Sequence, residues 1–261
     1  VLVSANAIAQ NAITLQKGQA IKITNTSHMT AELGMGMQMT NDVTAITNAV
    51  VKDENDVNYV ISSKVTKLVV KSEMMGNNTN YDSDKKEDQE TEVGKSLASF
   101  VNTESTTQLN KATGKVDSMK VADVDAEAQQ KLGPLSETMQ NISGDVMIAG
   151  IYQGIPAGAK PGVTWSDTTN KDGLNAISHY TLKSVDNGIS TIDMKGTMTG
   201  AKQIEAQGGM PIDAKNSGTI LVAANGLVKK RTLKVEMTNE MNVAGQAMTM
   251  TATTDSESTV E

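Results

Sequence analysis

The fold class is set by residues 57–69, "VNYVISSKVTKLV", whose side chains alternate over the whole stretch. Most apolar side chains fall on one parity, and most polar ones fall on the other. The apolar parity holds Val57, Tyr59, Ile61, Val65 and Val69. A period of two places one set on a buried face and leaves the other in water, which is typical of strands in antiparallel sheets.

The same alternation recurs along the chain and is interrupted by turn residues. Ile21 and Ile23 alternate with polar neighbours, and residues 233–237, "LKVEM", repeat the pattern. Asn187-Gly188 and Asn225-Gly226 separate such runs, and Asn-Gly favours tight hairpins because both residues accept positive φ. We therefore predict a mainly β protein, with long, twisted antiparallel strands that form a curved sheet, an open barrel or a sandwich.

One region departs from the period of two. Residues 121–143 are rich in helix formers, and their apolar residues recur at spacings of three and four. These residues are Leu132, Leu135, Met139 and Ile142. We predict two β halves of similar pattern, residues 10–120 and 145–261, joined by a helical connector at 121–144. A short helix is also expected within residues 92–101.

Composition excludes several classes of function. The chain has 261 residues, a net charge of −7 and no cysteine. Lys229-Lys230-Arg231 is its longest basic run, and on a strand Lys229 and Arg231 would share one face. We expect no nucleic-acid partner, because an acidic surface repels phosphate. The lack of cysteine rules out disulfides, thiolate zinc sites and a cysteine nucleophile.

The first residues predict export. In "VLVSANAIAQNAITLQKG", residues 1–18, no charge precedes Lys17, and Ala5-Asn6-Ala7 and Ala7-Ile8-Ala9 fit the small-x-small rule of signal peptidase. We interpret residues 1–9 as the remnant of a signal peptide. No other segment has the about 18–20 apolar residues that a transmembrane helix needs. The expected location is the periplasm or the cell surface.

Several short elements in a fixed order carry a family resemblance. They are Lys17-Gly18, Tyr81-Asp82-Ser83, Gly114-Lys115-Val116, and the segment with Pro156, Pro161-Gly162 and Trp165. Over nearly the whole chain, this order resembles an uncharacterised, exported, β-rich family typical of Bacteroidetes, known as a domain of unknown function. The resemblance implies an exported β-rich protein. It brings no known activity, ligand or catalytic residue.

Motifs of catalysis are sparse. The only histidines are His28 and His179, and no G-x-S-x-G exists to expose a nucleophile. We interpret both histidines as ordinary strand residues. In Tyr81-Asp82-Ser83 we expect Tyr81 to fill the edge of the core, Asp82 to meet backbone amides and Ser83 to cap the next segment. We assign no catalytic residue, no cofactor and no metal site.

The 16 methionines are the most unusual feature, since aromatic residues make up only 2% of the chain. Met is flexible and fills irregular space, so methionines on one strand face predict an adaptable apolar surface. The "MGMQM" run should place Met35, Met37 and Met39 on such a face. The predicted lining is Met35, Met37, Met39, Ile61, Val65, Met194 and Met198.

The leading hypothesis is a non-catalytic envelope protein that binds a lipid-like apolar ligand, or another envelope protein, through this lining. A hydrolase with two carboxylates is an alternative, because carboxylate pairs leave no sequence spacing to detect. A copper-binding protein is another, because thioethers select Cu(I); it needs three converging thioethers, or two and His28. A purely structural role is a further alternative to all three.

Overall fold

The computed structural model describes residues 12–261 apart from 33–35, 75, 122–131, 133–134, 136–138, 140–141, 143, 172, 205–207 and 244–245. The strands are β1 (Ala20–Glu32), β2 (Gln38–Glu54), β3 (Asn58–Met74), β4 (Asn77–Asp82), β5 (Glu104–Asn110), β6 (Val116–Val121), β7 (Thr164–Lys171), β8 (Leu174–Asp186), β9 (Ile189–Ile204), β10 (Gly208–Ala223), β11 (Val228–Val243) and β12 (Gln246–Val260). The helices are α1 (Lys86–Gln89), α2 (Glu92–Ala98) and α5 (Gly144–Ala149). The prediction of a mainly β protein is confirmed, and α2 lies where a short helix was expected.

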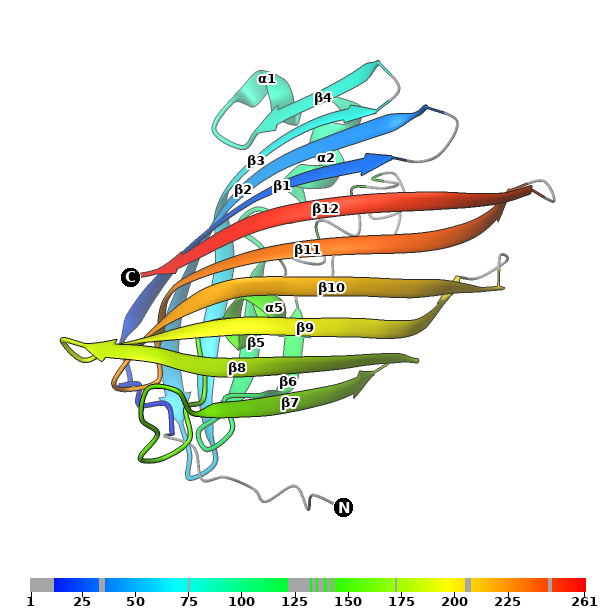
Figure 1. Ribbon diagram of the computed structural model, residues 1–261. Coiled ribbons are helices and arrows are strands. Elements are labelled where there is room, and N and C mark those ends of the chain that lie inside the picture. Colours follow the sequence, from blue (N-terminus) through cyan, green and yellow to red (C-terminus); the bar gives the residue numbers. More distant parts are fainter. Residues whose placement is uncertain are drawn as a thin grey trace.

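All strands belong to one 12-stranded sheet in the order β6-β5-β3-β2-β1-β12-β11-β10-β9-β8-β7, and β4 pairs with β3 beside this path. The first and last strands of the chain, β1 and β12, pair in its middle. The sheet is curved and open, with β6 and β7 as its two ends (Figure 1). Of the three predicted architectures, the open curved sheet is therefore the one observed, and strands from both halves contribute to it.

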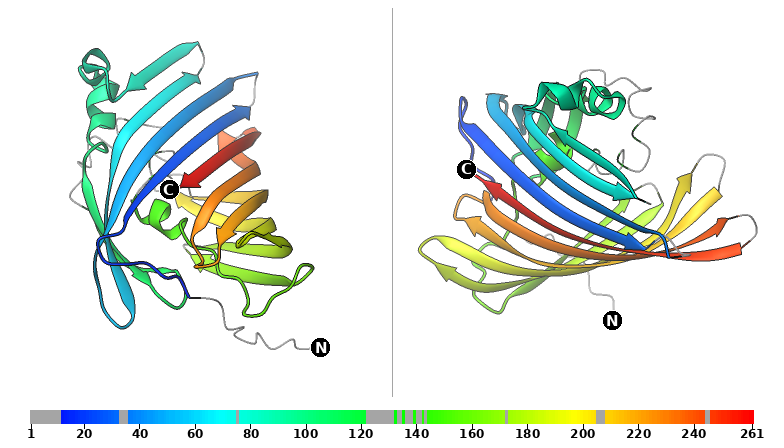
Figure 2. Two further views of the ribbon diagram at one scale, coloured as in Figure 1. Left: turned by 90° about the vertical axis from the view of Figure 1, so that its left-hand side faces the viewer. Right: turned by 90° about the horizontal axis from the view of Figure 1, so that it is seen from above.

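The sheet has an inner and an outer face. Figure 2 shows the helices gathered on its concave side, and we call that side the inner face. There α5 shares an apolar cluster with Ile61 and Ile23, and Leu97 of α2 shares another with Leu68. The long strands thus bury one face under short helices, as expected for strands of period two.

Three apolar clusters cover parts of the inner face. The first surrounds α5 and joins both halves, because it contains Ile61 of β3 and Leu227 beside β11. The second lies under α2 on β2 and β3. The third lies on β7–β11 around Ile192 and Ile220. All four connector residues named in the sequence analysis, Leu132, Leu135, Met139 and Ile142, are buried in the second cluster, so the apolar face expected there is confirmed.

Bulges correct two expectations about strand faces. β3 shifts its register against β2 between Ile46 and Thr47, so Leu68 and Val70 are buried and Val69 turns outward. The expectation that Val69 shares a face with Ile61 is wrong for this reason. A second shift, between Leu221 and Val222, leaves Lys229 exposed while Arg231 points inward.

Tyr59 fastens the segment before β1 to β3. Its hydroxyl accepts a hydrogen bond from the backbone N–H of Leu15 at 3.2 Å and donates one to the carbonyl of Ile13 at 3.3 Å. Tyr59→Phe leaves both buried backbone groups without these partners, so we expect it to lower the free energy of unfolding by about 1–3 kcal/mol. Tyr81→Phe is the matched control, because the buried Tyr81 hydroxyl has no hydrogen-bond partner among the described residues. Urea denaturation of both variants makes the comparison, and equal costs would contradict this role of Tyr59.

Candidate functional site

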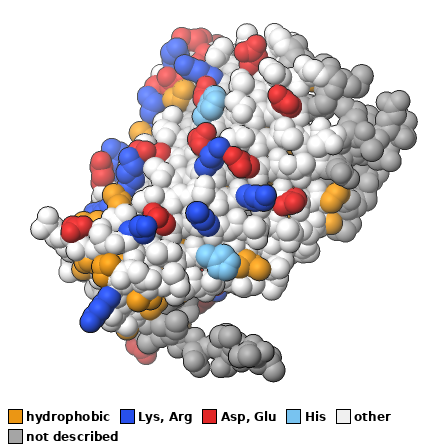
Figure 3. Space-filling model, in the orientation of Figure 1, with side chains coloured by type: hydrophobic (Ala, Val, Ile, Leu, Met, Phe, Trp, Pro, Cys, Tyr) orange, Lys and Arg blue, Asp and Glu red, His pale blue; other side chains and the backbone are white. Residues whose placement is uncertain are grey.

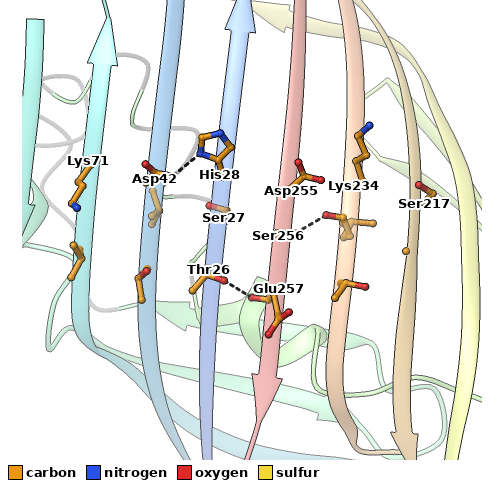
Figure 4. A pocket seen from close by; sticks show the side chains of 16 residues that line it. Thr26, Ser27, His28, Asp42, Lys71, Ser217, Lys234, Asp255, Ser256 and Glu257 are labelled. Carbon is orange, nitrogen blue, oxygen red and sulfur yellow. Dashed lines mark hydrogen bonds and ion pairs between the residues drawn. The ribbon is translucent and has the colours of Figure 1, made fainter.

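The outer face carries an open, shallow depression of about 770 Å³ over β3, β2, β1, β12, β11 and β10. Figure 3 shows this face, on which acidic and basic side chains gather and few apolar ones appear. Strand register places one outward row across it: Lys71, Asp42, His28, Asp255, Lys234 and Ser217. Figure 4 shows this row from close by.

His28 is the centre of the row. Its Nδ1 lies 2.6 Å from Oδ1 of Asp42, and Asp255 faces it from β12. Both partners of the His28–Asp42 pair are more than half exposed, so solvent screens their attraction. Among the described residues, no three His, Asp or Glu side chains lie close enough together to hold a metal ion. The arrangement is that of a hydrated charged surface, which fits the interpretation of His28 as an ordinary strand residue.

His179 has a partner that sequence reasoning missed. Ser166 lies opposite it on β7, and the serine Oγ is 2.7 Å from His179 Nδ1. The pair is exposed, and the next residue across the sheet is Lys195, not a carboxylate. A serine nucleophile needs a base oriented by an acid, and in the described chain no acid is bonded to this pair. The register of β7 against β8 is the signal that could have revealed it.

The inner face carries a different row. At one level of the sheet, methionine and alanine side chains face inward from β3 and from the seven strands that follow it in the sheet order. The full row, from β3 to β8, is Met74, Met39, Ala31, Ala252, Met237, Ala214, Met198 and Ala176. We call this set the Met-Ala row. Its methionines are partly exposed, whereas Ala31, Ala214 and Ala252 are buried.

The structure separates part of the predicted lining. Met39 and Met198 belong to the Met-Ala row, but Gly36 forms a turn with φ 76° and β2 begins only at Gln38. Met37 therefore lies in the hairpin connection, and the expectation that it shares a strand face with Met39 is wrong. Met35 lies outside the described residues.

The other predicted lining residues are core residues. Ile61 is buried in the first cluster, Val65 in the second and Met194 in the third. All three point inward, as expected, but they do not meet at one place. The row that does span the sheet depends on strand order, which the sequence pattern alone does not supply.

The spacing of the methionines in the row also tests the copper-binding hypothesis. Met39 and Met74 are direct cross-strand partners. The next methionine of the row, Met237, is separated from Met39 by Ala31 and Ala252 on two intervening strands. Strands lie about 4.8 Å apart, so this separation is about 14 Å along the sheet. The described part of the row brings two thioethers together, and His28 lies on the outer face, so neither three thioethers nor two with His28 converge among the described residues.

Polar groups without partners are buried on the inner face. Arg231 Nε, Asn216 Oδ1 and Trp165 Nε1 are buried and have no hydrogen-bond partner in the part of the chain that the structure describes. Burial lowers the pKa of Arg231, and burial raises the pKa of the nearby Tyr180 hydroxyl. Unpaired buried polar groups are rare in native proteins and call for an explanation such as a ligand.

The residues of the family resemblance have structural roles. Tyr81 is 3% exposed and packs in the second cluster, and Asp82 Oδ1 accepts the N–H of Asp84 at 3.1 Å. Ser83 exchanges two hydrogen bonds with the backbone of Leu68, at 3.0 and 2.9 Å. It thus secures the bulged part of β3 instead of capping the next segment, which corrects the expectation for Ser83.

The segment before β7 closes the third cluster. Pro156 is buried, and Gly162 donates its N–H to Leu182 at 2.7 Å. Pro161 stands beside it, exposed. Trp165 stacks on Tyr180, with ring centroids 5.5 Å apart. These residues hold the start of β7 against β8.

Comparison with known protein families shows to which family the chain belongs. A family of unknown function, DUF6263, matches residues 56–225, which is more than half of the chain. The chain belongs to the DUF6263 family. The match confirms the resemblance to a domain of unknown function and assigns no activity. No curated protein sequence matches the chain.

Two solved structures can be compared with this DUF6263 member. A structure of lipovitellin, described as showing lipid–protein interactions, covers 95% of this chain at 9% identity with a TM-score of 0.55. The chain spans only 25% of that lipovitellin chain, so the likeness shows the fold alone. An outer membrane channel from Pseudomonas putida F1 covers 96% of this chain and 98% of its own at 8% identity, but the TM-score is 0.21. Among the described residues, no helix has the length and hydropathy to cross a bilayer.

Proposed function

We propose that this protein binds a lipid-like apolar ligand on the inner face of its sheet. The observation that carries the proposal is the Met-Ala row, an inward-facing apolar band across eight strands whose methionines keep partial exposure. Methionine side chains rearrange easily around ligands of different shape, and in this row it is the methionines that keep accessible surface for a ligand.

Two further observations support it. The inner faces of β1 and β12 above the first cluster are covered by none of the three clusters, and Ser27, Met29 and Thr254 remain partly exposed there. The fold also resembles that of lipovitellin, a protein described by its lipid interactions. We further propose export to the periplasm or the cell surface, where such a ligand is at hand, on the basis of the small-x-small pattern near Ala9.

The test compares one inward and one outward substitution on the same strand. Met237 faces inward in the Met-Ala row, and Thr238 faces outward. Binding of hexadecanol is measured by isothermal titration calorimetry for the wild type, Met237→Gln and Thr238→Gln. We expect Met237→Gln to weaken binding by about tenfold, since it replaces an apolar thioether contact to the ligand with an amide, and Thr238→Gln to leave it unchanged.

Native mass spectrometry gives an independent reading. Protein purified gently from its own source should carry extra mass that organic solvent extracts. A wild type that neither binds hexadecanol nor carries extractable mass contradicts the proposal, and so does an equal effect of the two substitutions.

A further inference from the structure

Arg231 is a partly buried cation on the same face as the Met-Ala row, and it has no counter-ion among the described residues. It faces inward from β11, between Ser258 of β12 and Ile220 of β10. One guanidinium nitrogen, Nη1, lies 3.8 Å from the position that a Cβ would occupy on Gly150, just after α5. The side chain therefore extends from the sheet to the end of that helix.

The surroundings of Arg231 leave its charge uncompensated. Its Nε is buried and lacks a hydrogen-bond partner, and no carboxylate of the described residues lies within 4.0 Å of the guanidinium. The groups beside it are apolar or neutral: Ile220 is fully buried and Tyr180 is a phenol. A charge that is largely withdrawn from water and lacks a partner is unfavourable, and an arginine cannot lose its charge by deprotonation. Such a site favours an anion.

Apolar side chains lead from Arg231 to the Met-Ala row. Leu233, Val235 and Met237 follow it on the inner face of β11, all partly exposed. Met237 is six residues from Arg231. At about 3.3 Å per residue, the distance along β11 from Arg231 to Met237 is about 20 Å, which suits a long acyl chain.

Small polar residues lie beside Arg231 on the two neighbouring strands β12 and β1. Ser258 lies directly across from Arg231 on β12, and Asn25 lies across from Ser258 on β1. Both are partly exposed on the inner face. A hydroxyl and an amide beside a guanidinium are donors that suit the oxygens of a carboxylate or a phosphate.

We propose that Arg231 binds the anionic head group of the ligand, a carboxylate or phosphate, while the acyl chain lies along the inner face of β11 toward the Met-Ala row. The proposal rests on the proposed function and names its ligand class as a single-chain anionic amphiphile. Charge-assisted hydrogen bonds from arginine are the strongest common kind, and they are stronger still away from water.

The test uses two probes that share a chain and differ in the head group, hexadecanoate and hexadecanol. Calorimetry on the delipidated full chain should show that the wild type prefers hexadecanoate by at least about tenfold. Arg231→Met should bind the two probes equally, and Arg231→Lys should keep part of the preference. Lys230→Met is the matched control, because Lys230 lies one residue away on the outer face, paired with Glu257 at 2.9 Å. It should behave as the wild type.

Thermal unfolding of ligand-free protein adds a readout that separates ligand binding from a structural role. If Arg231 only awaits an anion, Arg231→Met removes an unpaired, partly buried charge and should raise Tm. A lower Tm for this variant would show that the arginine holds the fold together, and would overturn the proposal.

The remaining outcomes are distinct. Equal binding of both probes by the wild type overturns the head-group assignment and leaves the proposed function standing. A third outcome is that the wild type binds neither probe, while inorganic phosphate raises its Tm and Arg231→Met abolishes that increase. This result would place a free anion at Arg231, and it would overturn both the acyl-chain assignment and the proposed function. Preference for hexadecanoate that persists in Arg231→Met means that another group binds the head.

Discussion

Gly114→Ala should destabilise the protein by at least about 3 kcal/mol, because it combines a strained backbone with a steric clash. Gly114 has φ +64°, and a Cβ there would lie 1.8 Å from Cδ1 of Tyr152. Gly226, with φ +82°, faces the same ring, and its Cβ would lie 2.8 Å from Cε2. The Tyr152 ring thus sits against the turn before β6 and the turn before β11.

These two turns belong to different halves of the chain, so the ring helps to hold the two halves together. The segment around it continues the link, since Gln153 donates its N–H to Gly226 at 3.2 Å and Val228 donates to Ile151 at 2.8 Å. A methyl group at Gly114 displaces the ring and disturbs both contacts. Urea denaturation of Gly114→Ala measures the loss.

Gly188→Ala is the matched control. Gly188 also has positive φ, +76°, but nothing lies within 4 Å of its Cβ position. It should cost only the backbone strain, about 1–2 kcal/mol. In a Tyr152→Ala background, Gly114→Ala should cost no more than Gly188→Ala. Equal costs in the wild-type background would mean that the ring moves aside freely, against the role given to it here.

Alternation and turn chemistry predict most of the fold, because both are local. The run around Ile61 is a strand with a buried face, and Asn187-Gly188 is a hairpin turn in which both residues have positive φ. Two of the failed predictions have different causes, one non-local and one local. The bulge opposite Ile46 turned Val69 outward, and the turn at Gly36 removed Met37 from its strand.

Prediction of the site was less complete, because it depends on strand order. Met39 and Met198 lie far apart in the sequence, and they enter one row only through the pairing of β1 with β12. The alternation expected for a strand places Lys229 and Arg231 on one face, and nothing in Lys229-Lys230-Arg231 marks Arg231 as the residue that turns inward. Its inward direction follows from the shift of β11 against β10 and from the packing of α5 above it.

Ile148→Ala should lower the free energy of unfolding by about 3 kcal/mol, because a large buried side chain leaves a cavity. Ile148 of α5 is fully buried in the first cluster, which also holds Ile23 of β1 and Leu227 beside β11. This helix has only six residues, too few to persist without its packing. Its burial is therefore what keeps it on the inner face.

The same helix offers a matched control in Val146, which is 46% exposed. Val146→Ala should change the unfolding free energy by no more than about 0.5 kcal/mol. The two variants also separate stability from shape. If α5 covers the apolar surface of the first cluster, Ile148→Ala should raise the binding of a fluorescent hydrophobic dye at temperatures below the unfolding transition of the protein. Val146→Ala should not. Equal dye binding by both variants, with the expected loss of stability, would mean that α5 supports the sheet without covering the surface on which the ligand is proposed to bind.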